Sequence, residues 1–148
     1  MDKHEAKALD DIKSYGCHII HVMEDDSHPR FSYSIGIEQC TGQPELIVTG
    51  LDQELAHWLI NEYNRRVKSG ETFKPDQFYS GFLDKFDVTF KKVQQQYHPT
   101  YFGWAHWLYK GDSFRALQLI YPSTKGMWPW DSNASDDFTW FIPQLYLS

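Results

Sequence analysis

Side chains alternate over residues 31–37, FSYSIGI, and this period of two constrains the fold more than any other feature. Successive side chains of a strand point to opposite faces, so the stretch predicts a strand with one large and one small face. The large face comprises Phe31, Tyr33, Ile35 and Ile37. The small face comprises Ser32, Ser34 and Gly36. A second apolar run over residues 45–51, ELIVTGL, predicts a neighbouring strand of the same sheet.

Two glycines, Gly36 and Gly50, interrupt or end these strands. Glycine in a strand marks a bend or a place where another group approaches the backbone closely. We favour a bend as the reason at both positions. If a close approach is the reason instead, Ser32, Ser34 and Gly36 would form the floor of a site.

Two helices are predicted from their caps and their apolar spacing. Residues 2–15 carry a loose apolar stripe, with Asp2 as N-cap and Gly16 where the helix stops. The longer helix follows Asp52 and ends before Gly70, with acidic residues near its start and basic residues near its end. Its apolar positions recur at helical spacing and predict the buried face: Leu55, Trp58, Leu59, Tyr63 and Val67.

The remaining segments predict further strands and one short helix. Residues 78–93 are expected to form a hairpin, and residues 100–109 a short helix, before a mostly irregular C-terminal segment. The further strands are expected over residues 17–23, 78–83, 86–93 and 114–122.

Short loops between these elements favour antiparallel neighbours. We therefore predict an α+β fold, with a curved, mainly antiparallel sheet of about six strands and two or three helices packed on it. The length of 148 residues is typical of one domain. We expect a single domain over residues 1–148, with an N-terminal helix in 1–16 and the core in 17–148.

Charge and composition exclude several classes of partner. The formal net charge of −6 opposes binding to nucleic acid and to anionic membranes, both of which attract basic surfaces. No apolar run approaches the roughly 18 residues of a membrane span, and the polar start of the chain does not resemble a signal peptide. Only two cysteines, Cys17 and Cys40, are present. We expect a reduced, cytoplasmic protein in which both thiols are packing residues.

No catalytic motif is recognisable, and no catalytic residue, cofactor or metal is predicted. His18 and His21 are three residues apart and lie on opposite faces of a strand, which makes them a poor metal pair. His57 has no histidine or carboxylate partner four residues later, and a zinc site could come only from distant residues. Ser32 and Ser34 share a strand face, but the sequence lacks a G-x-S-x-G nucleophile motif.

Aromatic residues are abundant, with six Trp, nine Tyr and ten Phe. They gather in YFGWAHW and GMWPW, where Pro129 fixes the backbone between two indoles and lowers the entropy cost of presenting them. These segments could form a lid whose rings belong to the core, or a pocket or protein-binding patch. The residues expected to carry binding in the second case are Tyr101, Trp104, His106, Asp112, Trp128, Trp130 and Asp131.

Six stretches in order resemble the largely bacterial family catalogued as domain of unknown function 4262. They are HIIHVMED, FSYSIGI, PELIVTGL followed by LAHWLIN, RVKSGETF, YFGWAHWLYKGDSFRALQLIYP and GMWPW. The resemblance runs from about residue 16 to the C-terminus. This chain departs from the family pattern in having Gln43 where a histidine is frequent, and Trp128 where the pattern often has phenylalanine. The resemblance implies a bacterial, cytoplasmic, single-domain protein and does not choose between enzyme and binding protein.

Three functions remain open. The first is a non-catalytic protein-binding domain, such as an immunity protein or antitoxin whose acidic, aromatic surface covers a basic toxin. The second is a small-molecule site, with or without catalysis, that holds a planar, flavin-like ligand between the small strand face and the aromatic rim. The third is self-assembly through an exposed edge strand, for which residues 114–122 are the candidate.

Overall fold

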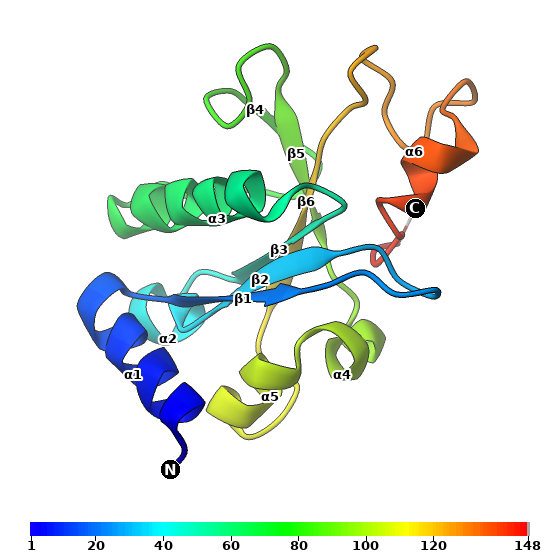
Figure 1. Cartoon of the computed structure of the whole chain (residues 1–148). Helices are drawn as coiled ribbons and strands as arrows, with labels where there is room; N and C mark the ends of the chain where they lie inside the picture. The colour runs from blue at the N-terminus through cyan, green and yellow to red at the C-terminus, as the bar shows by residue number, and fades with distance from the viewer. Residues whose placement is uncertain (148) are drawn as a thin grey trace.

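The computed structural model describes residues 1–147 and contains one six-stranded sheet with helices on both faces (Figure 1). The strands lie in the order β1-β2-β3-β6-β5-β4, and β3 and β6 run parallel while all other neighbours are antiparallel. Their bounds are β1 His18–Val22, β2 Phe31–Ile35, β3 Glu45–Thr49, β4 Phe78–Tyr79, β5 Val88–Lys92 and β6 Ala116–Ile120. The α+β class is confirmed, and the sheet is mixed because one of its five strand pairs is parallel.

Six α-helices occur within residues 1–147, where two or three were expected. They are α1 Lys3–Tyr15, α2 Ile37–Thr41, α3 Gln53–Lys68, α4 His98–Tyr101, α5 Gly103–Tyr109 and α6 Asp136–Trp140, with a 3₁₀ turn at Gln95–Tyr97. In Figure 1, α3 covers one face of the sheet, and α1, α4 and α5 cover the other. The additional helices have four or five residues, too few to show an apolar period in the sequence.

The two predicted long helices are confirmed with their caps. Asp2 forms a reciprocal capping box with Glu5, and Gly16 ends α1 in the left-handed conformation. The Asp52 carboxylate accepts a hydrogen bond from the Leu55 N–H at the start of α3. One position of the predicted apolar face is wrong, because half of the Trp58 surface is exposed.

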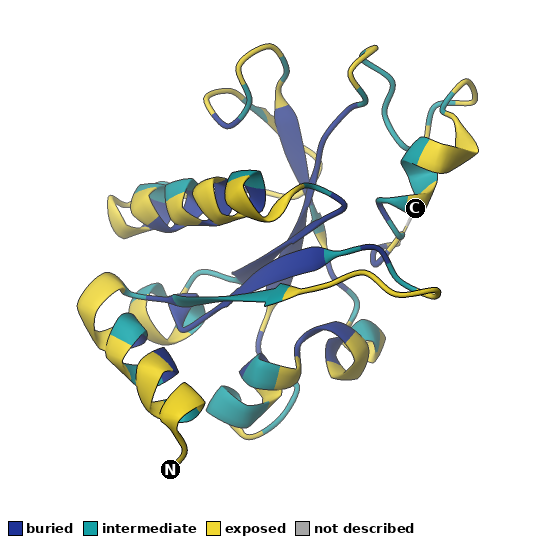
Figure 2. Cartoon of the chain, in the orientation of Figure 1, coloured by how far each residue is buried: buried dark blue, intermediate teal, exposed yellow. Residues whose placement is uncertain are grey.

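The core consists of two layers, one on each face of the sheet. Side chains of β3 alternate between them: Leu46 and Val48 pack with α3, whereas Ile47 packs with β2 and the helices of the other face. Figure 2 shows the central strands buried and the outer surface of α3 exposed. Both faces of the sheet are therefore covered, which explains why β2 and β3 are buried along their whole length.

The segment expected as an edge strand, residues 114–122, is instead interior. Its strand β6 lies between β3 and β5, and the edges of the sheet are β1 and β4. The connection from β3 to β6 contains α3, β4 and β5, so β6 returns parallel to β3 after a long excursion. Because β6 pairs on both sides, self-assembly through this strand is excluded.

The predicted hairpin over residues 78–93 is only partly correct. Strand β4 consists of Phe78 and Tyr79 alone, and β5 begins at Val88, so residues 80–87 form a longer loop. The two strands are antiparallel, with Phe78 opposite Thr89. This loop projects from one end of the sheet in Figure 1.

Gly36 and Gly50 have positive φ angles, +101° and +78°, and both meet another part of the chain closely. A Cβ on Gly36 would lie 2.7 Å from Cγ1 of Ile12, and one on Gly50 would lie 2.5 Å from Cβ of Phe141. Both glycines therefore combine the expected bend with the alternative, a close approach to the backbone. The approaching groups are residues of this chain, Ile12 at Gly36 and Phe141 at Gly50. At Gly36 the turn ends β2, and Ile37, expected in the strand, begins α2.

Candidate functional site

A cleft of about 950 Å³ lies at the carboxyl ends of the parallel strands β3 and β6. We call it the β3–β6 cleft, and its lining comes from the segments after those strands, from the β4–β5 loop and from α6. These residues are Gly50, Leu51, Leu83–Phe86, Tyr121–Lys125, Met127, Asn133, Ser135, Asp137, Phe138 and Phe141. Ligand sites of open α/β sheets lie outside the carboxyl ends of parallel strands, which is the position of this cleft.

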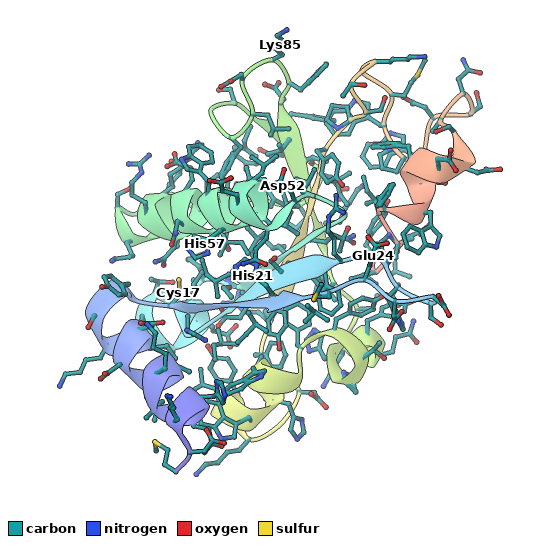
Figure 3. The ribbon with its side chains drawn as sticks, in the orientation of Figure 1. Cys17, His21, Glu24, Asp52, His57 and Lys85 are labelled. Atoms are coloured by element: carbon teal, nitrogen blue, oxygen red, sulfur yellow. The ribbon has the colours of Figure 1, made fainter. Side chains whose placement is uncertain are left out.

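The walls of the β3–β6 cleft are mostly apolar and aromatic, and charged groups stand at its margin. Phe86, Phe138 and Phe141 contribute ring surface, while Lys85 and Lys125 are exposed. Figure 3 places Lys85 at the tip of the β4–β5 loop. An apolar enclosure with a few convergent polar groups is the usual form of a small-molecule site.

Three contacts fix the end of β3 where the cleft begins. The Tyr121 hydroxyl donates a hydrogen bond to the Thr49 carbonyl at 2.7 Å, and the Arg30 Nε donates to the Leu51 carbonyl at 2.9 Å. The guanidinium of Arg30 also lies 5.8 Å from the centroid of the Phe141 ring. Because of these contacts, the floor of the cleft is a fixed part of the sheet and not a free loop.

A second cluster lies nearby, between β1, β2 and α3. The His21 Nδ1 is 2.6 Å from the Ser32 Oγ, and the His21 Nε2 is 3.2 Å from the His57 Nδ1. Figure 3 shows His21 and His57 beside each other between the sheet and α3. His21 and Ser32 line a hollow of about 200 Å³, which shares Leu51 with the β3–β6 cleft. We call this cluster the Ser–His–His chain.

A third polar cluster is internal and has a structural function. The carboxylate of Glu45 is completely buried and accepts hydrogen bonds from the Ser34 Oγ at 2.7 Å and from the Tyr109 hydroxyl. It also accepts from three consecutive backbone N–H groups at the start of α2, those of Gly36, Ile37 and Glu38, at 3.0 to 3.2 Å. Burial raises the pKa of Glu45 to about 7, although these hydrogen bonds oppose the rise.

Ser32 and Ser34 therefore have different surroundings, although they share a strand face. Ser34 is fully buried, bonds to Glu45 and accepts from the Leu46 N–H at 3.0 Å, so it does not line an open site. Gly36 is covered by Ile12. The alternative of a floor formed by Ser32, Ser34 and Gly36 is therefore not realised, and of the three only Ser32 lines the hollow beside His21.

The first predicted aromatic group lies on the face of the sheet that α1 covers. Tyr101 is buried against Phe31, and the Trp104 N–H donates to the Tyr33 hydroxyl at 3.0 Å. His106 is exposed and its Nδ1 lies 3.0 Å from the Asp112 carboxylate. Tyr101 is thus a core residue, whereas His106 and Asp112 form a surface pair.

The second predicted aromatic group lies on the opposite face, so the two groups do not form one surface. Trp128 packs against the core layer of α3, whereas Trp104 packs against the other layer. The rings of Trp128 and Trp130 are parallel, with centroids 5.4 Å apart, and 46 % of Trp130 is exposed. The Asp131 carboxylate accepts from the Trp128 N–H at 2.8 Å, which holds the turn.

Sequence reasoning missed Glu45, His21 and His57 as members of polar clusters. His21 was compared only with His18, and His57 only with the residue four positions later, whereas His21 and His57 are separated by 36 residues in the chain. The small face of β2 was the available signal, since a serine beside a histidine-bearing strand can accept or donate a hydrogen bond. Nothing local distinguishes Glu45 from an exposed glutamate at the start of a strand.

Neither a metal cluster nor a membrane helix is found in the described part of the chain. Among residues 1–147, no three His, Cys, Asp or Glu side chains are placed to hold a metal ion together. No helix within the same residues combines the length and the apolar character that a membrane crossing requires.

The two cysteines have opposite surroundings, and the expectation that both are packing residues is wrong for Cys40. Cys17 is buried, and burial raises the pKa of its thiol to about 12, whereas Cys40 is exposed on α2. We expect one thiol to react rapidly with a disulfide reagent in the folded protein and the second only after unfolding. Cys40→Ser should remove the rapid phase and Cys17→Ser should not; a rapid phase that persists in Cys40→Ser would contradict the placement.

One family accounts for most of the chain. The sequence model of the family described as Domain of unknown function (DUF4262) matches residues 11–135. The match includes α3, β1 to β6 and the Ser–His–His chain, and it ends before α6. The searches of curated proteins and of solved structures found no match to this chain. Because the match covers far more than half of the sequence, the chain belongs to the family of domain of unknown function DUF4262.

Proposed function

We propose that the chain binds a small organic molecule with an apolar, ring-containing body in the β3–β6 cleft. The observation that carries the proposal is the cleft's volume of about 950 Å³ at the carboxyl ends of two parallel strands. Sites for drug-sized ligands have volumes of roughly 300–1,000 Å³ and predominantly apolar walls. The aromatic side chains of Phe86, Phe138 and Phe141 suit a flat ligand.

Charge around the cleft favours a ligand with polar groups at its ends. The lining contains two lysines, Lys85 and Lys125, and two aspartates, Asp84 and Asp137, so cations and anions are balanced. A balanced margin attracts neither strongly anionic nor strongly cationic compounds. The ligand class that fits is a neutral or zwitterionic compound whose ring system is buried and whose polar ends meet the margin.

The test is a thermal-shift screen with a library of soluble ring compounds, in which binding raises the melting temperature. A ligand present at a hundred times its Kd should stabilise the folded protein by about 2.7 kcal/mol. For a chain of this length, that corresponds to a rise of roughly 5 to 10 °C. Native mass spectrometry of the purified protein should show the same compound bound once per chain.

A matched pair of variants locates the site. Asn133 lines the cleft and is exposed, whereas its neighbour Ser132 is exposed outside the lining. Asn133→Trp should fill the cleft and abolish the shift, and Ser132→Trp should leave the shift unchanged. Equal shifts in both variants would place the ligand elsewhere, and the absence of any stabilising compound would count against the proposal.

A protein partner is the second candidate, and it is favoured by exposed indoles. Trp130 and Trp140 are 46 % and 41 % exposed, and tryptophan is enriched among the residues that dominate protein interfaces. The partner would be a basic protein, such as a toxin neutralised by this acidic chain. Capture from the native host with a high-salt wash should then return one basic protein at equal stoichiometry, and Trp130→Ala should lose it while Trp58→Ala keeps it.

A further inference from the structure

The Ser–His–His chain connects a nearly buried serine to an exposed histidine. Ser32 is 4 % exposed and His57 is an exposed residue of α3, with His21 between them. The ring centroids of His21 and His57 are 5.4 Å apart while their facing nitrogens are 3.2 Å apart, so the rings meet through nitrogen atoms. This geometry is that of an N–H···N hydrogen bond.

Two arrangements of protons satisfy both links, and one of them makes Ser32 the donor. With hydrogen on Nε2 of both rings, the Ser32 hydroxyl donates to the His21 Nδ1, and the His21 Nε2–H donates to the His57 Nδ1. In this arrangement His21 can act as a general base toward Ser32. His57 holds the His21 ring in the orientation needed to accept the Ser32 proton. A nucleophile, a base and a third group that orients the base are the parts of a nucleophilic site.

The surroundings keep His21 able to accept a proton. Burial lowers the pKa of His21, and the neighbouring His57 and His18 rings lower it further, which favours the neutral imidazole. The other charged groups at the hollow are Glu24 and Arg30, which pair with each other at 3.5 Å. Figure 3 shows that Glu24 and Asp52 are separate from the two rings.

The hollow that contains Ser32 limits what can react there. Its volume of about 200 Å³ is below the usual range for drug-sized ligands, so only a small acyl group fits. Arg30 lines the same hollow, and its guanidinium pairs there with Glu24. Its Nε and Nη2 already donate to the Leu51 and Gly50 carbonyls, which fixes the guanidinium.

We propose that Ser32 is the nucleophile of an acyl-transfer site for small esters, with His21 as general base and His57 as a positioning residue. The Ser32 Oγ forms a bond to the ester carbonyl carbon as its proton passes to the His21 Nδ1. The ester C–O bond breaks, and His21 gives the proton to the departing alkoxide, which leaves as an alcohol. Water then attacks the acyl-serine with the same base, releasing a carboxylic acid and restoring Ser32. This activity is independent of ligand binding in the β3–β6 cleft.

The experiment uses p-nitrophenyl acetate with the full chain carrying Cys40→Ser, because the exposed thiol would also react. We expect a burst of about one nitrophenolate per chain, and peptide mass spectrometry should locate the acetyl group on Ser32. Ser32→Ala should abolish the burst, whereas Ser14→Ala, which changes an exposed serine of α1, should not. Because the acetyl group is mapped in the Cys40→Ser protein, the result does not depend on the folding of Ser32→Ala.

Two further variants separate the base from its positioning residue. His21→Gln should reduce the acylation rate by roughly 10²- to 10⁴-fold, as expected when a general base is lost. His57→Gln should reduce the rate less and move the midpoint of the pH–rate profile to higher pH, because the His57 ring lowers the pKa of His21. Acetylation found only on lysines or the N-terminus, or a burst unchanged in Ser32→Ala, would overturn the proposal.

Discussion

Replacing Glu45 with alanine is expected to lower the free energy of unfolding by at least ~3 kcal/mol. The change removes the acceptor of five hydrogen bonds, and the donors that remain are buried or lie at the start of α2. Each buried donor left without a partner costs about 1–3 kcal/mol. Urea unfolding followed by far-UV circular dichroism measures the loss. Glu54→Ala, which removes an exposed carboxylate, should change stability by less than about 0.5 kcal/mol.

The same carboxylate makes stability depend on pH in a definite direction. Its pKa in the folded chain is about 7, above the value of 4.5 that applies in the unfolded chain. The folded state therefore holds a proton that the unfolded state has released, and the stability contributed by this group falls as pH rises from about 4.5 to 7. Glu45→Gln lacks this titration, so the stability difference between wild type and Glu45→Gln should shrink over that range.

A milder variant keeps the test of Glu45 available if alanine and glutamine prevent folding. The phenolic hydrogen bond from Tyr109 lowers the pKa of the Glu45 carboxyl. Tyr109→Phe removes this hydrogen bond and should therefore raise that pKa. The pH window of declining stability should then extend to higher pH. If the pH dependence is the same in Tyr109→Phe and wild type, Glu45 is not the titrating group.

The elements that could be predicted from the sequence are those whose determining residues lie within one segment. Helix α3 was predicted with its N-cap because Asp52, the apolar spacing and the basic residues of the last turn all lie within one segment. The strand at FSYSIGI was predicted for the same reason, apart from its last two residues. Gly36 caps α2 and Ile37 begins it, and Glu45, eight residues after Ile37, accepts a hydrogen bond from the Ile37 N–H.

What the sequence could not show depends on residues far apart in the chain. The parallel pairing of Glu45 with Ala116 brings together segments separated by α3, β4 and β5. It places the ends of β3 and β6 side by side and so creates the β3–β6 cleft, which no sequence motif predicts. Ser32 was singled out from its strand face, but its partners His21 and His57 come from β1 and α3.

The positions of the two aromatic segments could not be predicted for a related reason. Trp104 and Trp128 both stand in ring-rich segments, and composition alone cannot show that the sheet separates them. The segments instead contribute to two core layers, so the lid interpretation holds for buried Tyr101. Trp130 is the member of the set whose exposed ring keeps the binding interpretation open.

The second large effect is expected at Gly50, which lines the β3–β6 cleft. A Cβ there would lie 2.5 Å from both the Cβ and the carbonyl oxygen of Phe141 and 2.8 Å from the Tyr121 hydroxyl. Truncating Phe141 to alanine cannot relieve this clash, because alanine keeps both atoms. Gly50→Ala should therefore cost about 3 kcal/mol or more, the sum of left-handed strain of roughly 1–2 kcal/mol and overpacking of roughly 1–3 kcal/mol.

Gly42 provides a matched control, because its φ of +80° is nearly that of Gly50 and a Cβ there would meet nothing within 4 Å. Gly42→Ala should cost only the backbone strain of roughly 1–2 kcal/mol, and chemical denaturation of the two variants isolates the clash by subtraction. Gly50→Ala should also displace Phe141 from the cleft wall and abolish the thermal shift of a cleft ligand, which Gly42→Ala should retain. Equal losses of stability would mean that the C-terminal segment yields without cost and that the cleft wall is not fixed by this contact.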